Sequence, residues 1–289
     1  MTDSRNSSAA SPIVTLPTIA LLGAGSLGRA ILAGLIAPGV EVSGGIRVTN
    51  RTSAASTELP RHPSLTLFAT ENDPDANSQA TSDARIVIVA VKPPMVPELL
   101  RQIAPVLRSD AVVVSVAAGV TVATMEALVP DSVRVIRSMP NTPALVGKAV
   151  TGISAGTRAT PRDVSVIRTL FETVGEVVEV PESQIDALST ISGSGPAYVF
   201  ALIEALTAAA VDKGFSLETA RTLVEQTFLG SAELLVSSHE TPAQLRRKVT
   251  SPGGTTERAL EVMAQADLSD LFVRATDAAL ARANELARY

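Results

Sequence analysis

The sequence predicts an α/β protein in which a doubly wound sheet is followed by an all-helical domain. Three observations predict this fold class. A glycine-rich turn, Gly23–Gly28, stands between an apolar run and a helical pattern near the start of the 289-residue chain. Short Val/Ile runs then alternate with helical or turn signals as far as residue 181, which is typical of a parallel sheet covered by helices on both faces. From residue 182 onward the patterns are long and helical.

The composition excludes several classes of protein. The chain is 46% hydrophobic with a formal net charge of −5, which suits one or two buried cores and argues against a nucleic-acid surface. There is no cysteine, and the two histidines are His62 and His239. Disulfides and thiolate chemistry are therefore excluded, and we expect no metal site. We find no apolar run near the roughly 18 to 20 residues that span a bilayer, so no membrane partner is expected.

The first 17 residues are predicted to be a disordered tail. They are rich in Ser, Ala and Asn, carry Arg5 as their one basic side chain, and lack the apolar segment of a signal peptide. The sheet domain is expected over residues 18–181. It begins with the strand-like apolar run Thr18–Leu22, directly before the glycine turn.

The motif Gly23-Ala24-Gly25-Ser26-Leu27-Gly28 predicts a dinucleotide site. Gly23 permits the sharp turn, Gly25 lets a diphosphate approach the main chain, and Gly28 lets the helix pack against the strand. With Ser26 and Leu27 they place unpaired N–H groups at the positive end of a helix dipole. The alternative is a loop that is merely rich in small residues. The strand before the motif and the helix after it favour the nucleotide.

The end of the second strand indicates which dinucleotide binds. The strand Ile46–Thr49 runs into Asn50, Arg51 and Thr52. An NAD site normally carries an Asp or Glu at this position for the ribose hydroxyls, and none is present. An arginine beside amide and hydroxyl groups suits a 2′-phosphate. We therefore predict NADPH, with NADH as the alternative coenzyme and a solvated arginine as the structural alternative.

Six more strands are expected, and the residues that follow them matter because ligands gather at the carboxyl ends of strands in open α/β sheets. The strands are Leu65–Phe68, Ile86–Val91, Val112–Val116, Val133–Ile136, Val150–Ser154 and Val177–Val180. Two of these ends, at Lys92-Pro93 and Ala117-Ala118-Gly119, have the small residues and prolines of a rim where a cofactor lies close to the backbone. Lys92 is a candidate base, but a lysine before two prolines is more often a helix-entry residue.

The expected strand that begins at Val133 is followed by the segment Ser138-Met139-Pro140-Asn141-Thr142-Pro143. Two prolines fix this loop, which leaves Asn141 and Thr142 free to hydrogen-bond a ligand. Structural rigidity alone would also explain the prolines.

The second half, residues 182–289, is predicted to be entirely helical. Helices are expected at residues 196–214, 217–235, from 241, 255–263 and 268–286. Two glycine- and hydroxyl-rich segments, Ser192–Pro196 and Thr250–Thr256, head predicted helices and suit the capture of a small anion. Ordinary capping is the alternative. The broad apolar faces predict pairing with another subunit, and a self-contained bundle is the alternative.

Taken together, five motifs resemble those of the pyrroline-5-carboxylate reductase family. In chain order they are Gly23–Gly28, Ala90–Pro93, Ser138–Pro143, Ser192–Tyr198 and Thr250–Thr256. The resemblance covers essentially the whole chain after the tail. It implies NAD(P)H-dependent reduction of the ring imine of 1-pyrroline-5-carboxylate to L-proline, the last step of proline biosynthesis. It also implies a cytoplasmic enzyme with a Rossmann-type domain and an all-helical dimerisation domain, a homodimer that often assembles further into decamers.

The resemblance also implies site residues. Contacts with the cofactor are implied for Gly23, Gly25, Ser26, Leu27, Gly28, Asn50, Arg51, Thr52, Asn77, Ala90, Val91, Lys92, Pro93, Ala117, Ala118 and Gly119. Contacts with the substrate are implied for Met139, Asn141, Ser251, Gly253, Gly254, Thr255 and Thr256, with Ser251 and Thr256 as catalytic candidates and the Thr256 hydroxyl nearest the ring nitrogen. Two positions depart from the family pattern. Arg85 stands where many relatives have an acidic residue, and a substrate-side Glu of some relatives aligns near His239 or Glu240.

The residue inventory agrees with imine reduction. A protonated imine is already positive and hydride addition neutralises it, so positioning is expected to do most of the work. A β-hydroxyacid dehydrogenase is the alternative enzyme. It would need a lysine base in the helical half, where Lys213 and Lys248 are typical of a helix end and of a basic run. A non-catalytic NADP sensor is the other alternative, and it would have no use for a carboxylate pocket.

Overall fold

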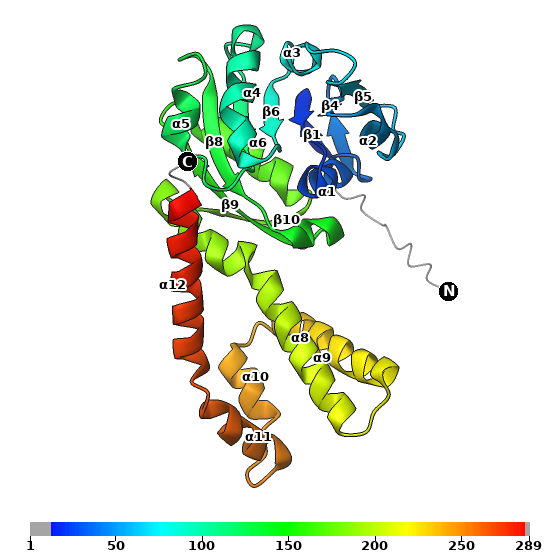
Figure 1. Ribbon diagram of the computed structural model, residues 1–289, viewed down its shortest axis with the longest axis vertical. Coiled ribbons are helices and arrows are strands. Elements are labelled where there is room, and N and C mark those ends of the chain that lie inside the picture. Colours follow the sequence, from blue (N-terminus) through cyan, green and yellow to red (C-terminus); the bar gives the residue numbers. More distant parts are fainter. Residues whose placement is uncertain (1–12, 287–289) are drawn as a thin grey trace, which may run out of the picture. The chain divides into compact units, whose positions relative to one another are not determined.

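The computed structural model describes residues 13–286 (Figure 1). These divide into two compact units, residues 13–193 with 280–286 and residues 194–279, and each unit is described by itself. Most of the predicted tail, residues 1–12, lies outside the described residues, as do residues 287–289.

The first unit is built on an eight-stranded sheet, which contains all of the predicted strands. The strands are β2 (Ile19–Leu22), β4 (Ile46–Asn50), β5 (Leu65–Ala69), β6 (Ile86–Val89), β7 (Val112–Ser115), β8 (Arg134–Met139), β9 (Ala149–Ala155) and β10 (Gly175–Glu179), in the order β10-β9-β8-β7-β6-β2-β4-β5. From β5 to β8 this is the order 3-2-1-4-5-6 of doubly wound nucleotide-binding sheets. The predicted fold class is confirmed.

Helices cover both faces of this sheet. One face carries α1 (Ser26–Leu35) and α6 (Pro161–Glu172), and the other carries α3 (Ala76–Thr81), α4 (Val96–Ile103) and α5 (Val122–Glu126). In β2, Ile19 and Leu21 join the core under α1, whereas Ala20 and Leu22 join the core under α4. Both faces are buried, and this is why the strands are continuous apolar runs in the sequence.

The sheet is not parallel throughout, because β8 and β9 run antiparallel. Residues 140–148 join them and contain only a short 3₁₀ turn, η3 (Thr142–Val146). A parallel crossover requires a dozen or more residues, so a link this short brings the chain straight back beside β8. The connection from β9 to β10 contains α6, and those two strands are parallel.

The prediction of a disordered tail over residues 1–17 is wrong for its last residues, because Val14–Leu16 form a strand. Strand β1 (Val14–Leu16) pairs in parallel with β3 (Val40–Val42), and Leu16 is 1% exposed. The small polar residues before position 13 hid this three-residue strand from sequence analysis. Its alternating burial, with Leu16 turned into the core and Thr15 exposed, is the pattern of a half-buried strand.

The second half is helical throughout the described residues 182–286, as predicted. Its elements are η4 (Glu182–Gln184), α7 (Ile185–Leu188), η5 (Ser189–Gly193), α8 (Gly195–Asp212), α9 (Leu217–Ser238), α10 (Pro242–Lys248), α11 (Thr255–Ala264) and α12 (Leu268–Leu286). The compact units divide after Gly193, beyond the predicted boundary at 181/182. The reason is that α7 packs on β8 and β9, and Ile185 is 1% exposed.

One helical run is longer and more apolar than the sequence analysis expected. Glu182–Asp212 form a 31-residue run whose best window has a mean hydropathy of 1.4, enough by length and composition to cross a membrane. The expectation that no such run exists is therefore wrong. One helix of this kind is weak support for membrane insertion. Phe200, 60% exposed, and Leu206, 47% exposed, lie on α8 as a face open to pairing with another subunit.

A buried carboxylate, Asp163, ties α6 to the sheet and explains the unusual Arg85. Asp163 is 2% exposed and accepts hydrogen bonds from Thr160 N at 3.0 Å and from Arg85 Nη2 at 2.8 Å. Burial raises the pKa of this carboxyl, but the hydrogen bonds from Thr160 and Arg85 outweigh burial and hold the pKa below its ordinary value. Arg85 therefore has a structural role at this position.

Replacing Asp163 by asparagine should lower the free energy of unfolding by about 2 to 3 kcal/mol at neutral pH, because the partly buried Arg85 loses the closer of its two carboxylate partners and keeps Asp110 at 3.5 Å. The folded pKa lies below the unfolded value of about 3.9, so this contribution is present above that pH and is lost as the pH falls through the folded pKa. Urea unfolding at pH 7 and pH 3, at one protein concentration, measures both effects. A difference between wild type and variant that is as large at pH 3 as at pH 7 would contradict the assignment.

Candidate functional site

A cleft of about 1030 Å³ opens in the first unit at the carboxyl ends of β2, β4 and β6. The strand order reverses between β2 and β6, which is where ligands bind in open α/β sheets. Many of the predicted cofactor residues line this cleft: Gly23, Gly25, Ser26, Asn50, Arg51, Thr52, Asn77, Ala90, Val91 and Lys92. The structure thus gathers residues from four separate segments of the sequence.

The other predicted cofactor residues lie outside this lining. They are Leu27, Gly28, Pro93, Ala117, Ala118 and Gly119. Leu27 packs against the core under α1, and Ala117 is 5% exposed in the core of the opposite face. In this structure both residues pack in the cores beneath the cleft and do not line it.

The glycine turn has the geometry that a diphosphate requires. Gly23 has φ +96°, and a Cβ atom there would come within 2.9 Å of Ala90 O. A Cβ atom at Gly28 would lie 2.3 Å from Gly23 O, whereas one at Gly25 would meet no described heavy atom within 4 Å. Described side chains leave the N-terminus of α1 uncapped. The turn is therefore tight at Gly23 and Gly28 and open at Gly25, which fits an anion on the first N–H groups of α1.

Two polar side chains hold this turn in place. Asn50, 7% exposed, accepts a hydrogen bond from Ala24 N at 3.1 Å through Oδ1. Arg29 donates from Nε to Ala24 O at 3.1 Å and from Nη2 to Glu58 at 2.6 Å. Arg29 lines the cleft but was missed by sequence analysis. Arg29 could have been identified from its position in the first turn of the helix that follows the glycine motif.

The end of the cleft beyond β4 carries both signs of charge. Arg51 is exposed and forms no ion pair within residues 13–286. Thr52 Oγ1 accepts from Ala55 N at 3.2 Å and so caps the short helix α2 (Ser53–Thr57). The backbone N–H of Ser53 donates to Glu71 Oε1 at 2.6 Å. The predicted cation and hydroxyl are in place, and Glu71 is an acidic neighbour that the sequence analysis did not identify.

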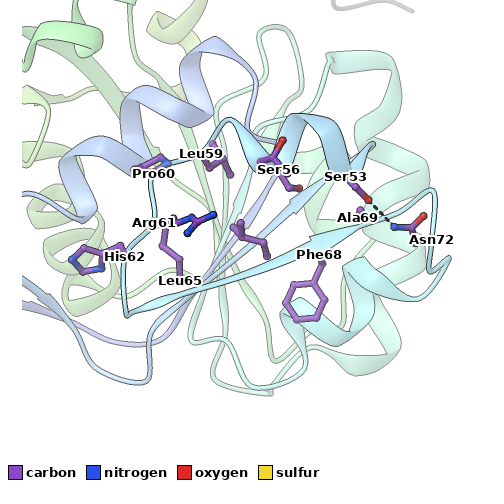
Figure 2. A pocket seen from close by; sticks show the side chains of 12 residues that line it. Ser53, Ser56, Leu59, Pro60, Arg61, His62, Leu65, Phe68, Ala69 and Asn72 are labelled. Carbon is purple, nitrogen blue, oxygen red and sulfur yellow. Dashed lines mark hydrogen bonds between the residues drawn. The ribbon is translucent and has the colours of Figure 1, made fainter.

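A second hollow, of about 550 Å³, lies between α2 and the edge strand β5 (Figure 2). Its walls combine the apolar side chains of Leu59, Leu65 and Phe68 with Arg61. Figure 2 also shows the hydrogen bond of 2.7 Å from Asn72 Nδ2 to Ser53 Oγ. The predicted site residues do not line this hollow.

The loop after β8 uses its polar residue differently from the prediction. Asn141 is 9% exposed, donates from Nδ2 to Ser192 O at 2.9 Å and accepts from Val150 N at 2.9 Å. Both ends of the amide are thus engaged within the unit, and Asn141 fastens the loop to η5. The expectation that this side chain is free for a ligand does not hold in the structure. Met139 Cε lies beside Gly193, where an added Cβ atom would be 3.3 Å away.

The segment Ser192–Pro196 heads α8 as predicted, because α8 begins at Gly195 with Ser194 as its N-cap residue. It lies inside the continuous helical run Glu182–Asp212. Ser192 Oγ donates to Leu188 O at 3.2 Å, and Ser194 has helical backbone angles. Because η4, α7 and η5 lead into α8 as one helical run, this segment does not present the isolated helix terminus that was expected to capture an anion.

The loop Thr250–Thr256 in the second unit does form a helix start. Gly254 is the N-cap of α11, and Gly253 has φ +71°. Gly253 N donates to Glu257 Oε2 at 2.8 Å and Gly254 N to Ser251 O at 3.0 Å. The glycine amides that were expected to hold a carboxylate are therefore engaged. The first-turn N–H groups of Thr255 and Thr256, which described side chains leave uncapped, remain for it.

The residues left open by the sequence analysis have defined places. His239 ends α9 with φ +56°, and Glu240 pairs with Lys248 at 2.7 Å. Lys213 pairs with Asp212 at 3.0 Å. Each candidate lysine base thus has a carboxylate partner. Groups of acidic or histidine side chains able to hold a metal ion are absent from the described residues.

Comparisons with known proteins agree over nearly the whole chain. A family model described as pyrroline-5-carboxylate reductase dimerisation matches residues 182–286, and one described as NADP oxidoreductase, coenzyme F420-dependent, matches residues 18–119. The chain is 38% identical to pyrroline-5-carboxylate reductase of Corynebacterium melassecola, covering 95% of this chain and 100% of the relative. It is 36% identical to that of Pseudomonas aeruginosa, covering 95% and 98%.

Solved structures give the same picture. A pyrroline-5-carboxylate reductase of Coxiella burnetii superposes with a TM-score of 0.85 at 36% identity, covering 93% of this chain and 97% of the other. Pyrroline carboxylate reductase of Plasmodium falciparum, with NADP bound, gives 0.77 at 25% identity, covering 93% and 98%.

Proposed function

This chain belongs to the pyrroline-5-carboxylate reductase family, and from that premise we propose which of its residues hold the coenzyme and the substrate. It is an enzyme that reduces 1-pyrroline-5-carboxylate to L-proline with NADP(H), the last step of proline biosynthesis. The hydroxyacid dehydrogenase and the NADP sensor are set aside by this relationship.

The observation that carries the coenzyme assignment is the open space at Gly25 in front of an uncapped helix. We assign the diphosphate to the first N–H groups of α1, at Ser26 and its neighbours, with Gly25 allowing close approach. We assign the 2′-phosphate to Arg51 and Thr52 at the far end of the cleft. NADPH, when bound, supplies the hydride. NADH is the alternative coenzyme of the same cleft.

For the substrate we assign the carboxylate to the first-turn N–H groups of α11, at Thr255 and Thr256, aided by the hydroxyl of Ser251. The Thr256 hydroxyl then orients the ring nitrogen or relays a proton to it. Because hydride addition removes the charge of the protonated imine, the chain needs no strong acid, and positioning supplies most of the rate.

Replacing Thr256 by alanine should lower kcat by more than about tenfold, in keeping with typical contributions of a positioned proton-transfer group. The loss of NADPH absorbance with 1-pyrroline-5-carboxylate measures it. Thr256→Ser keeps the hydroxyl and serves as the matched control, and it should retain most of the rate. An unchanged rate and pH profile in the alanine variant would remove Thr256 from the mechanism.

The helical half makes the protein a homo-oligomer, since residues 182–286 match a dimerisation family. We assign the dimer contact to the exposed apolar faces of α8 and α9, which include Phe200 and Leu229. Further assembly into a decamer and a cytoplasmic location are part of the same proposal, and both rest on the family.

A further inference from the structure

An acidic side chain stands at the proposed 2′-phosphate position. The pairing of β4 with β5 continues past both strands, with Thr70 N donating to Asn50 O at 2.9 Å and Glu71 N to Arg51 O at 3.0 Å. In this register Asn50 pairs with Ala69, so Thr70 lies opposite Arg51 and Glu71 is held one residue beyond it by the hydrogen bond to Arg51 O. The Glu71 carboxylate turns to the start of α2 and accepts from Ser53 N at 2.6 Å.

Glu71 engages a group that a phosphate would need. Ser53 directly follows Arg51 and Thr52, and its N–H is the first donor of α2. The Ser53 hydroxyl accepts a hydrogen bond from Asn72, as Figure 2 shows. Arg51 forms no ion pair among the described side chains, Glu71 included. The Glu71 carboxylate therefore occupies the Ser53 N–H, next to the unpaired Arg51. A phosphate oxygen at this position would compete with the carboxylate for the N–H and would be repelled by its charge.

We propose that Glu71 determines the selectivity of this enzyme between NADPH and NADH. Its carboxylate acts as an internal substitute for the 2′-phosphate, so NADPH must displace it from Ser53 N whereas NADH leaves it in place. Glu71 thereby weakens the preference that Arg51 would otherwise give to NADPH. The inference rests on the proposed function, because it requires the 2′-phosphate to lie at Arg51 and Thr52.

The variant Glu71→Gln tests this directly, because the amide oxygen still accepts from Ser53 N while the negative charge is lost. NADP+ and NAD+ binding to the full-length oligomer is measured by calorimetry, together with kcat/KM for the two reduced coenzymes. We expect NADP+ to bind on the order of 3- to 10-fold more tightly, the size of one surface charge interaction. NAD+ should stay within about twofold, and the gain should shrink in high salt.

Two further variants separate the possible failures. Glu41→Gln removes the same charge from β3, the strand that precedes β4, and should change neither affinity. Arg51→Ala should weaken NADP+ selectively. If it does and Glu71→Gln leaves NADP+ affinity unchanged, the role of Glu71 is wrong and the coenzyme assignment stands. If neither variant alters the affinity for NADP+ relative to NAD+, the 2′-phosphate lies elsewhere and both assignments fail.

Discussion

Replacing Arg137 by alanine is expected to lower the free energy of unfolding by about 3 to 5 kcal/mol, the cost of removing one partner from a buried ion pair. The Arg137 side chain, on β8, is 3% exposed and pairs with Glu182 at 3.5 Å and with Asp186. Glu182 also accepts from Val122 N at 2.6 Å, at the start of α5. The variant would leave two carboxylates without their cation where the helical run Glu182–Asp212 meets the sheet.

Chemical denaturation at one fixed protein concentration measures this loss. Arg168→Ala is the matched control, because Arg168 in the same unit is also paired with a carboxylate, Glu179, at 3.5 Å, but is about one third exposed, and it also donates to Val177 O at 2.9 Å. Such exposed pairs contribute about 0 to 1 kcal/mol. Equal losses in the two variants would show that burial does not set the cost. Activity gives a second readout, since Arg137 directly precedes the loop Ser138–Pro143.

The sheet could be predicted from the sequence because each strand is a short apolar run buried on both faces. Ile86–Val89 and Val112–Ser115 consist mainly of valine and isoleucine, and every residue in both strands is buried. Some helix starts could be predicted in the same way. Thr241 is followed by Pro242 and, at the third position, Gln244, and the structure shows the full capping box. Strands and helix starts could thus be predicted because each depends on residues within a few positions of one another.

What the sequence could not predict is where a polar group finds its partner. Asn141 has the signal of a ligand-binding residue in a rigid loop, yet it is bound to Ser192, 51 positions away. Glu71 had no signal at all, because its partner Ser53 lies 18 positions back along the chain. An amide or carboxylate serves a ligand or a backbone N–H equally well, and only the tertiary fold decides between them.

The same reasoning applies to the loop before α11. The motif correctly placed a helix start at Thr255, and the hydroxyls suggested an anion site. Only the fold reveals that Glu257 accepts from Gly253 N and Ser251 O from Gly254 N, which leaves the N–H groups of Thr255 and Thr256 for the carboxylate that we propose to bind there. Residue types thus identified the segment, whereas the choice of donor atoms depended on a side chain within the helix itself.

Replacing Gly25 by alanine should leave the protein folded and weaken NADPH binding about 10- to 100-fold, the loss of one hydrogen bond to a charged group at about 1.5 to 3 kcal/mol. Gly25 has φ −69° and ψ −169°, which alanine adopts without strain, and its added Cβ would meet no described atom within 4 Å. The methyl group would instead occupy the space assigned to the diphosphate.

Gly28→Ala separates this effect from general damage to the turn. A Cβ atom at Gly28 would lie 2.3 Å from Gly23 O, so this variant should lose both thermal stability and NADPH affinity. Gly25→Ala should lose affinity at a nearly unchanged Tm, because a glycine at an N-cap is replaced at a cost of only a few tenths of a kcal/mol to about 1. Calorimetric titration and thermal unfolding distinguish the two. If Gly25→Ala bound NADPH as tightly as the wild type does, the diphosphate would not lie against this turn, because a methyl group cannot share space with a phosphate.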